Sequence, residues 1–203
     1  MIDLAILGLL KEQELHGYEL RKRLGELPGA RAGGVSFGSL YPALARLEKA
    51  GHVKAVEANT RTDRTVPSSG SLAGELAAFR ARHPLPTPGG RGKKVYGICP
   101  LGEARLLDML RDPQPVDDRT FALKVAFCRH LGPSERLALF ERRRAEIAAR
   151  IAEQQHRPER ALDRYVRTLR ERDDETLTTD LAWLDRLIAS EHEQATSTEE
   201  TNR

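Results

Sequence analysis

The sequence predicts a mainly α-helical protein with one small β-hairpin, and three observations support this fold class. The chain of 203 residues is rich in Leu, Ala, Arg and Glu, a composition typical of helices. Apolar residues recur at helical spacing along most of its length. Two short segments, His52 to Ala58 and Lys94 to Cys99, instead show the Val-containing pattern of strands. We therefore expect helices and a hairpin first, followed by helices alone.

Three short helices are expected before the hairpin. The first, Ile2 to Lys11, has a broad apolar face, and Glu14 to Gly17 is predicted to be a turn. The second, Tyr18 to Leu27, ends before Pro and Gly residues that break the chain. The third starts at Ser36, which can cap it, and runs to Ala50, where Gly51 is a fitting stop. The core positions predicted for the third helix are Leu40, Leu44 and Leu47.

A long insertion, residues 59–89, separates the two predicted strands. A hairpin normally needs only a short turn, so an insertion of this size is expected to be functional or disordered. Residues 59–94 carry 7 Lys/Arg and 2 Asp/Glu, whereas the whole chain has a net charge of only +3. This local excess predicts a phosphate-binding element. The insertion either adds basic contacts or binds an effector.

The second half of the chain is expected to form a separate helical domain. Asp112 to Pro115 is the clearest linker, which predicts domains at residues 1–111 and 116–190. The polar, acidic residues 191–203 are expected to be a disordered tail. Within the second domain, Ser134 can cap a helix. The last helix carries an apolar seam for another helix, made of Leu177, Leu181, Leu184 and Ile188.

Three helices followed by two strands is the element order of a winged helix-turn-helix with a two-stranded wing. In that arrangement the third helix fits the DNA major groove, and the basic hairpin reaches phosphates beside it. Four motifs support this interpretation: Leu4 to Leu10 (LAILGLL), His16 to Leu20 (HGYEL), Gly38 to Gly51 (GSLYPALARLEKAG) and Gly90 to Gly102 (GRGKKVYGICPLG).

These motifs resemble the PadR family of transcriptional regulators. The resemblance is close over residues 2–58 and 90–110 and extends to 118–188 in general helical character. It implies a homodimeric repressor whose residues 118–188 pack across a two-fold axis, bound to double-stranded DNA at an inverted-repeat operator. It also implies release from DNA by a small ligand or a stress signal. The insertion at residues 59–89 departs from the short wing loop of common family members.

The candidate DNA contacts lie on the second and third helices and on the wing. Hydroxyl groups and a helix N-terminus are suited to phosphates, and Lys and Arg of a wing neutralise them. Other roles stay open: Ser36 as a cap, Tyr41 as a core residue and Arg46 on a solvated face. The candidates are Tyr18, Ser36, Ser39, Tyr41, Arg46, Arg91, Lys93, Lys94 and Tyr96.

Trp183 is the single tryptophan of the chain, and it lies in the last amphipathic helix. It is a candidate contact for a small-molecule effector in a cavity between two subunits. It could equally anchor a subunit interface or pack between helices of one chain.

The sequence lacks the motifs of enzymes and metal proteins. Cys99 and Cys128 form no CxxC pair, and Cys128 and His130 lack further ligands at metal spacing. Gly89 to Gly92 lacks the Lys-Ser/Thr ending of a phosphate loop, and no nucleophile–base pair is recognisable. We therefore expect no catalysis, no metal and no cofactor.

Targeting signals are likewise not recognisable. No apolar run approaches the roughly 18 residues that span a bilayer, and no signal peptide is seen, so a cytoplasmic protein without a membrane partner is expected. The alternative function is a winged helix that binds another protein and never DNA. The charge at Arg91, Lys93 and Lys94, with hydroxyls on the third helix, favours DNA.

Overall fold

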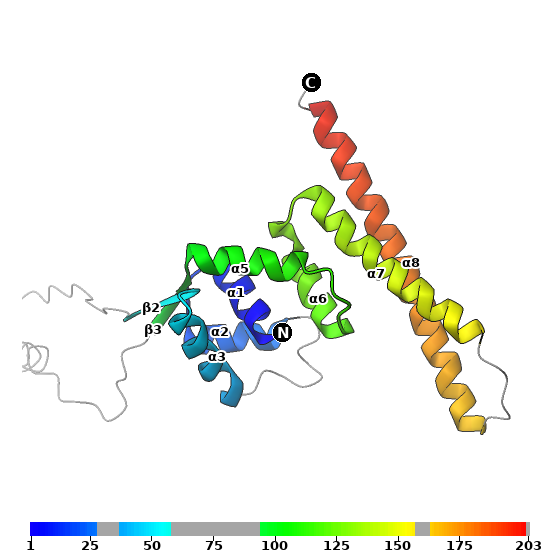
Figure 1. Ribbon diagram of the computed structural model, residues 1–203, viewed down its shortest axis with the longest axis horizontal. Helices are drawn as coiled ribbons and strands as arrows, with labels where there is room; N and C mark the ends of the chain where they lie inside the picture. Colours follow the sequence, from blue (N-terminus) through cyan, green and yellow to red (C-terminus); the bar gives the residue numbers. More distant parts are fainter. Residues whose placement is uncertain (28–36, 58–93, 157–162, 202–203) are drawn as a thin grey trace, which may run out of the picture. The chain divides into compact units, whose positions relative to one another are not determined.

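The computed structural model describes residues 1–27, 37–57, 94–156 and 163–201 (Figure 1). They form two compact units, and the division falls between Glu103 and Ala104 inside helix α5 (Pro100–Arg111). The N-terminal unit contains α1 (Ile2–Glu12), β1 (Leu15–His16), α2 (Gly17–Glu26), α3 (Phe37–Lys49), β2 (Val53–Glu57) and β3 (Lys94–Ile98). The C-terminal unit contains α6 (Asp118–Phe127), the short 3₁₀ helix η2 (Cys128–His130), α7 (Pro133–Gln155) and α8 (Arg164–Thr201). The mainly helical fold class is confirmed.

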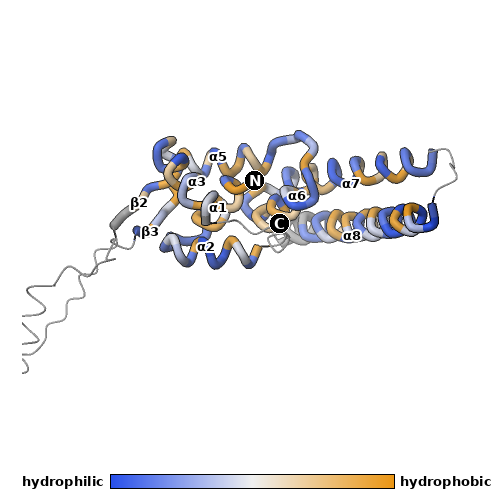
Figure 2. The backbone as a smooth tube through the Cα atoms, turned by 90° about the horizontal axis from the view of Figure 1, so that it is seen from below, coloured by the Kyte–Doolittle hydropathy of each residue, from blue (hydrophilic) through white to orange (hydrophobic). Residues whose placement is uncertain are grey.

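Helix α1 is the centre of the N-terminal core. Its residues from Leu4 to Leu10 are all buried, and the helix contacts α2, α3 and β3. Figure 2 shows α1 as largely hydrophobic, whereas α2 is mostly hydrophilic. Burial of this much apolar surface is the main favourable term for the unit. The predicted core positions of α3, Leu40, Leu44 and Leu47, are confirmed as buried.

The strands form an antiparallel sheet in the order β1-β3-β2. β2 and β3 match the two strands predicted for the wing, and their register pairs Ala55 with Tyr96. The prediction of a turn over Glu14 to Gly17 was wrong in part, because Leu15 and His16 form a third strand along the other edge of β3. The reason is burial: Leu15 is a core residue, and its position in the core brings the backbone alongside Tyr96.

Gly51 ends α3, as the sequence predicts. Its φ of 73° is in the left-handed region that favours glycine. The Gly51 N–H donates to the Glu48 carbonyl at 3.0 Å, and the His52 N–H donates to the Leu47 carbonyl at 2.9 Å. These two bonds are those of a Schellman motif, which satisfies the last carbonyls of a helix. The motif turns the chain directly into β2.

In the C-terminal unit, α7 and α8 lie side by side as an antiparallel pair (Figures 1 and 2). Phe140 and Ile147 of α7 and Leu184 of α8 are buried. The Arg136 guanidinium pairs with the Glu191 carboxylate at 2.9 Å, and both side chains are largely buried. This pair and a second one, between Arg144 and Asp185, set the register of the two helices.

Two predictions for this unit are corrected. Ser134 does not cap α7, because the helix already begins at Pro133, whose fixed φ suits a first helical position. The Glu135 carboxylate instead accepts a hydrogen bond from the Gly132 N–H at 2.9 Å. The tail expected to be disordered from residue 191 continues α8 to Thr201. Residues 191–201 contain no Gly or Pro to stop the helix, and the ion pair at Glu191 holds their start.

Among the residues that the structure describes, no helix is both long and apolar enough to cross a membrane.

Candidate DNA-binding surface

The start of α2, the first turns of α3 and the middle of β3 meet at Gly17. A Cβ atom at Gly17 would lie 3.5 Å from the Tyr41 ring and 3.6 Å from the Tyr96 ring. The His16 N–H at this helix start donates to the Glu19 carboxylate at 3.1 Å, which satisfies one of the free N–H groups of the helix end. The junction therefore fixes α2 and α3 against the sheet through two tyrosines.

Helix α3 presents small side chains on its outer face. Leu40, Leu44 and Leu47 face the core, whereas Ser39, Pro42 and Ala45 are exposed. Tyr41 is 48% exposed and so combines a packed ring with an accessible face. A helix with small outward residues can approach the floor of a DNA groove, which is why this face is suited to the role predicted for it.

Arg46, a predicted DNA contact, lies near the end of α3 and forms an ion pair with Asp3 of α1. The guanidinium remains mostly exposed. An exposed pair of this kind contributes at most about 1 kcal/mol, so it does not prevent Arg46 from binding a phosphate. The structure thus gives Arg46 a position on the rim of the outer face.

Tyr18 is 72% exposed in the first turn of α2, an accessible position that agrees with the phosphate contact predicted for it. Tyr96 does not fit its predicted contact, because only 7% of it is exposed. Burial raises the pKa of the Tyr96 phenol, and the nearby Glu48 and Tyr41 raise it further. The alternation of strand β3 turns this ring inward, so Tyr96 supports the surface from below.

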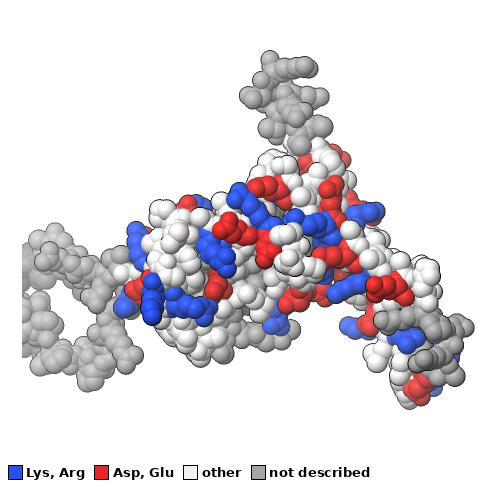
Figure 3. Space-filling model, in the orientation of Figure 1, with Lys and Arg blue, Asp and Glu red and all other residues white. Residues whose placement is uncertain are grey.

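The wing strands add exposed lysines to the surface. Lys94 opens β3, and Lys54 lies on the neighbouring β2. On the face seen in Figure 3, Lys and Arg side chains gather at the end of the N-terminal unit that carries β2 and β3. Lys54 also approaches Glu14, with 3.6 Å between Nζ and Oε1, and both side chains are exposed. Sequence reasoning missed Lys54, although its position in a short predicted strand beside a basic segment could have indicated it.

The remaining candidate residues, of the third helix and the wing, lie outside the described residues. They are Ser36, Arg91 and Lys93, together with the insertion at residues 59–89.

Trp183 is 40% exposed on α8, and its ring meets Phe121 edge to face, with 6.4 Å between the ring centroids. It therefore packs on its own chain while keeping an open face. Burial raises the pKa of the Cys128 thiol, which disfavours a reactive thiolate there. Within the described residues no group of His, Cys, Asp and Glu side chains could hold a metal ion.

Comparison with protein families gives one match: residues 6–66 fit the model of the transcriptional regulator PadR-like family. These residues are similar to the PadR-like family. The matched residues run from α1 through β2 and include all of α3. The resemblance to the PadR family is thereby confirmed over these residues, and the family is one of transcriptional regulators.

Solved structures of PadR and PadR-like regulators are also similar to this chain. PadR from Bacillus subtilis in complex with operator DNA is 20% identical, with 94% of this chain and 98% of that one covered and a TM-score of 0.38. The same protein in complex with p-coumaric acid is 21% identical with the same coverage and a TM-score of 0.37. The PadR-like regulator BC1756 from Bacillus cereus is 17% identical over 95% and 98% of the chains, with a TM-score of 0.36. A comparison with curated proteins finds no match.

Proposed function

We propose that this protein is a sequence-specific DNA-binding transcriptional regulator that acts as a repressor. The observation that carries this proposal is the PadR-like match, because it covers the helix whose small-residue face is exposed. A regulator of this type works where the chromosome lies, so we place it in the cytoplasm.

In the proposed complex, α3 lies in the major groove of double-stranded DNA. Ser39 and Tyr41 contact the duplex from the first turns of the helix, where hydroxyl and backbone N–H groups reach phosphates. Tyr18 contacts the backbone from α2, and Lys94 does so from the wing. Lys93 and Arg91 extend the wing contact. Because phosphate contacts are blind to sequence, specificity comes from the outer face of α3.

We propose that the regulator is a homodimer joined through the C-terminal unit. Helix α8 exposes Tyr165, Val166 and Leu169, large apolar side chains within two turns of one another. Large apolar side chains that cluster on a surface mark association sites. A two-fold dimer places two copies of α3 at half-sites about one turn of DNA apart, which predicts an inverted-repeat operator. A small ligand or a stress signal then releases the dimer from DNA, and the open face of Trp183 is a candidate contact for that ligand.

The proposal is tested by selecting bound fragments from genomic DNA and measuring the affinity for the selected operator as a function of salt. Lys94→Ala removes one phosphate contact from each subunit, two per bound dimer, so the slope of log K against log salt becomes shallower by about 1.8. Arg105→Ala removes the same charge from an exposed position on α5 and should leave the slope unchanged. If a folded dimer selects no DNA, the protein is a winged-helix module that binds another protein, and the proposal fails.

A further inference from the structure

The α7–α8 pair changes character beyond Ile147. Up to that residue its contact is apolar, with Phe140, Ile147 and Leu184 buried. Beyond it no residue of α7 from 148 to 155 is buried, and neither is any residue of α8 from 164 to 176. A cavity of about 440 Å³ lies between the helices at this point, within the size range of small-molecule sites.

Polar side chains occupy facing positions in this cavity. The ion pairs of Arg136 with Glu191 and of Arg144 with Asp185 fix an antiparallel register. Continued toward the end of α7, that register places Gln154 opposite Asp173, and both residues line the cavity. At Gln154 the side-chain oxygen is buried without a hydrogen-bond partner among the described residues, and an unpaired buried polar group costs free energy. Sequence choices that break a packing rule in this way are expected at functional sites.

The unpaired groups of the cavity are mostly hydrogen-bond acceptors. The Gln154 side-chain oxygen is buried and has no hydrogen-bond partner among the described residues. Asp180 is half-buried, Asp173 is exposed, and within the described part of the chain neither carboxylate forms an ion pair or a hydrogen bond. Arg143 also lines the cavity but is already bonded to Asp118 and Glu146. The Gln154 oxygen and the two carboxylates can therefore accept hydrogen bonds from a ligand that carries donor groups.

The balance of charge fixes the sign of that ligand. Arg143 and its ion-pair partner Asp118 line the cavity and balance each other. The other charged groups of the lining are the carboxylates of Glu153, Asp173 and Asp180 and the guanidinium of Arg150. Among the lining residues that the structure describes, this leaves an excess of two negative charges, which attracts cations and repels carboxylates. The described carboxylates form no group that could hold a metal ion, so a compact inorganic cation does not fit.

The spacing of the carboxylates fixes the shape of the ligand. Asp173 and Asp180 are two turns apart on α8, about 10 Å along the helix axis. Leu177 lies between them, and the buried Ile147 lines the cavity from α7, so the middle of the site is apolar. We propose that this cavity binds an elongated organic dication, with an ammonium group at each end and an aliphatic body between them.

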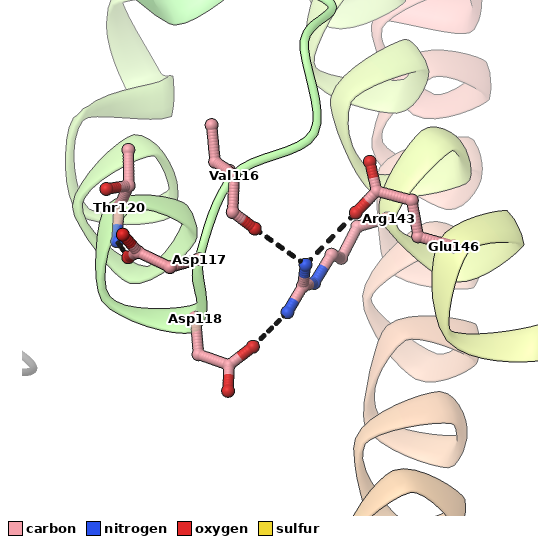
Figure 4. A network of polar contacts seen from close by, with 6 residues as sticks. All are labelled: Val116, Asp117, Asp118, Thr120, Arg143 and Glu146. Carbon is pink, nitrogen blue, oxygen red and sulfur yellow. Dashed lines mark hydrogen bonds and ion pairs between the residues drawn. The ribbon is translucent and has the colours of Figure 1, made fainter. Parts of the chain in front are cut away.

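One end of the cavity is the polar network of Arg143 (Figure 4). The Arg143 side chain is 5% exposed; it donates to the Val116 carbonyl at 3.1 Å and pairs with Asp118 and Glu146. A cation bound near Asp118 competes with Arg143 for that carboxylate and so loosens the segment that leads from α5 into α6. That the dication regulates DNA binding rests on the proposed function; its binding to the cavity does not.

Binding is measured by calorimetry on the full chain without DNA, with 1,8-diaminooctane as the probe. Suberate has a body of similar length with carboxylates at its ends, and 1,2-diaminoethane has both charges but is too short to bridge the two aspartates. We expect heat of binding for 1,8-diaminooctane at millimolar concentration, and binding at least about tenfold weaker for the other two, a difference of roughly 1.4 kcal/mol. Equal binding of suberate, or no binding of the long diamine, overturns the proposal.

Two double variants locate the site. Asp173→Asn with Asp180→Asn should weaken the binding of 1,8-diaminooctane by about tenfold, since each carboxylate contributes an ion pair at a partly exposed position. Asp174→Asn with Glu175→Gln removes two charges from exposed positions of the same helix that do not line the cavity, and should change binding by less than about twofold. An equal loss in both pairs shows attraction to the helix as a whole and overturns the proposal.

Sedimentation of the same variants tests the other occupant of the cavity. If Asp173→Asn with Asp180→Asn shifts the monomer–dimer equilibrium, the cavity is filled by a second copy of the chain, and the ligand proposal fails. If 1,8-diaminooctane changes the affinity for the operator but does not bind the protein in the absence of DNA, that result also counts against the ligand proposal. Loss of diamine binding with intact operator binding leaves the proposed function in place.

Discussion

Gly102 in the first turn of α5 has no room for a side chain. A Cβ atom there would overlap the His52 carbonyl oxygen and lie 2.9 Å from both the His52 carbonyl carbon and the Ile98 side chain. The His52 oxygen cannot move away freely, because it accepts a hydrogen bond from the Cys99 N–H at 2.9 Å. Gly102→Ala therefore pushes the start of α5 away from His52, which lies in the turn after α3.

The change in the free energy of unfolding that Gly102→Ala causes is the sum of two opposing effects. Overpacking against backbone costs up to about 3 kcal/mol. Replacing Gly by Ala in a helix recovers about 1 kcal/mol. Gly102→Ala is therefore expected to lower the free energy of unfolding of the N-terminal unit by about 2 kcal/mol.

Gly25 in α2 supplies the matched control. A Cβ atom at Gly25 has nothing within 4 Å, so only the helix preference remains. Gly25→Ala should raise stability by about 0.5 to 1 kcal/mol. Urea unfolding followed by circular dichroism measures both variants, since a change in midpoint at constant slope reports stability. If the two substitutions shift the midpoint equally, the contact at His52 does not constrain the fold.

Three further substitutions test the C-terminal unit. Asp117 caps α6 by accepting a hydrogen bond from the Thr120 N–H at 2.7 Å, so Asp117→Ala should cost about 1 kcal/mol in chemical unfolding. That bond lowers the pKa of Asp117, so its contribution is complete above the unfolded pKa of about 3.9 and fades as pH falls through the folded pKa; a loss independent of pH would contradict it. Leu184→Ala empties a buried site and should cost about 3 kcal/mol, against less than about 0.5 kcal/mol for the exposed Leu169→Ala. Leu169→Ala should instead weaken the dimer in sedimentation, and an unchanged dimer would place the interface elsewhere.

The sequence predicted the N-terminal elements well because their signals are local. Leu40, Leu44 and Leu47 mark one helix face, and Gly51 marks its end; both follow from periodicity and backbone conformation. The third strand could not be predicted, because Leu15 and His16 pair with residues some eighty positions away. Two residues carry too little pattern to reveal a strand of that kind.

The candidate surface was only partly predictable for the same reason. Ser39 and Tyr41 lie on a helix whose faces can be read from spacing, and the structure exposes both. Tyr96 belongs to a strand of five residues, where the inward and outward sides depend on register. The cavity at Gln154, Asp173 and Asp180 was out of reach, because it depends on the register between α7 and α8 that two ion pairs fix.

In the proposed complex the outer face of α3 lies in the DNA major groove, and two substitutions that each add a charge test this placement most directly. Ala45 is exposed in the middle of α3, and Ala145 is exposed in the middle of α7. Ala45→Glu and Ala145→Glu add the same side chain to a helix surface, with a similar and small effect on folding. On the selected operator, Ala45→Glu should weaken binding by at least about a hundredfold, because it drives a carboxylate into phosphates and base edges, while Ala145→Glu stays within about threefold. Wild-type affinity for Ala45→Glu would contradict the account.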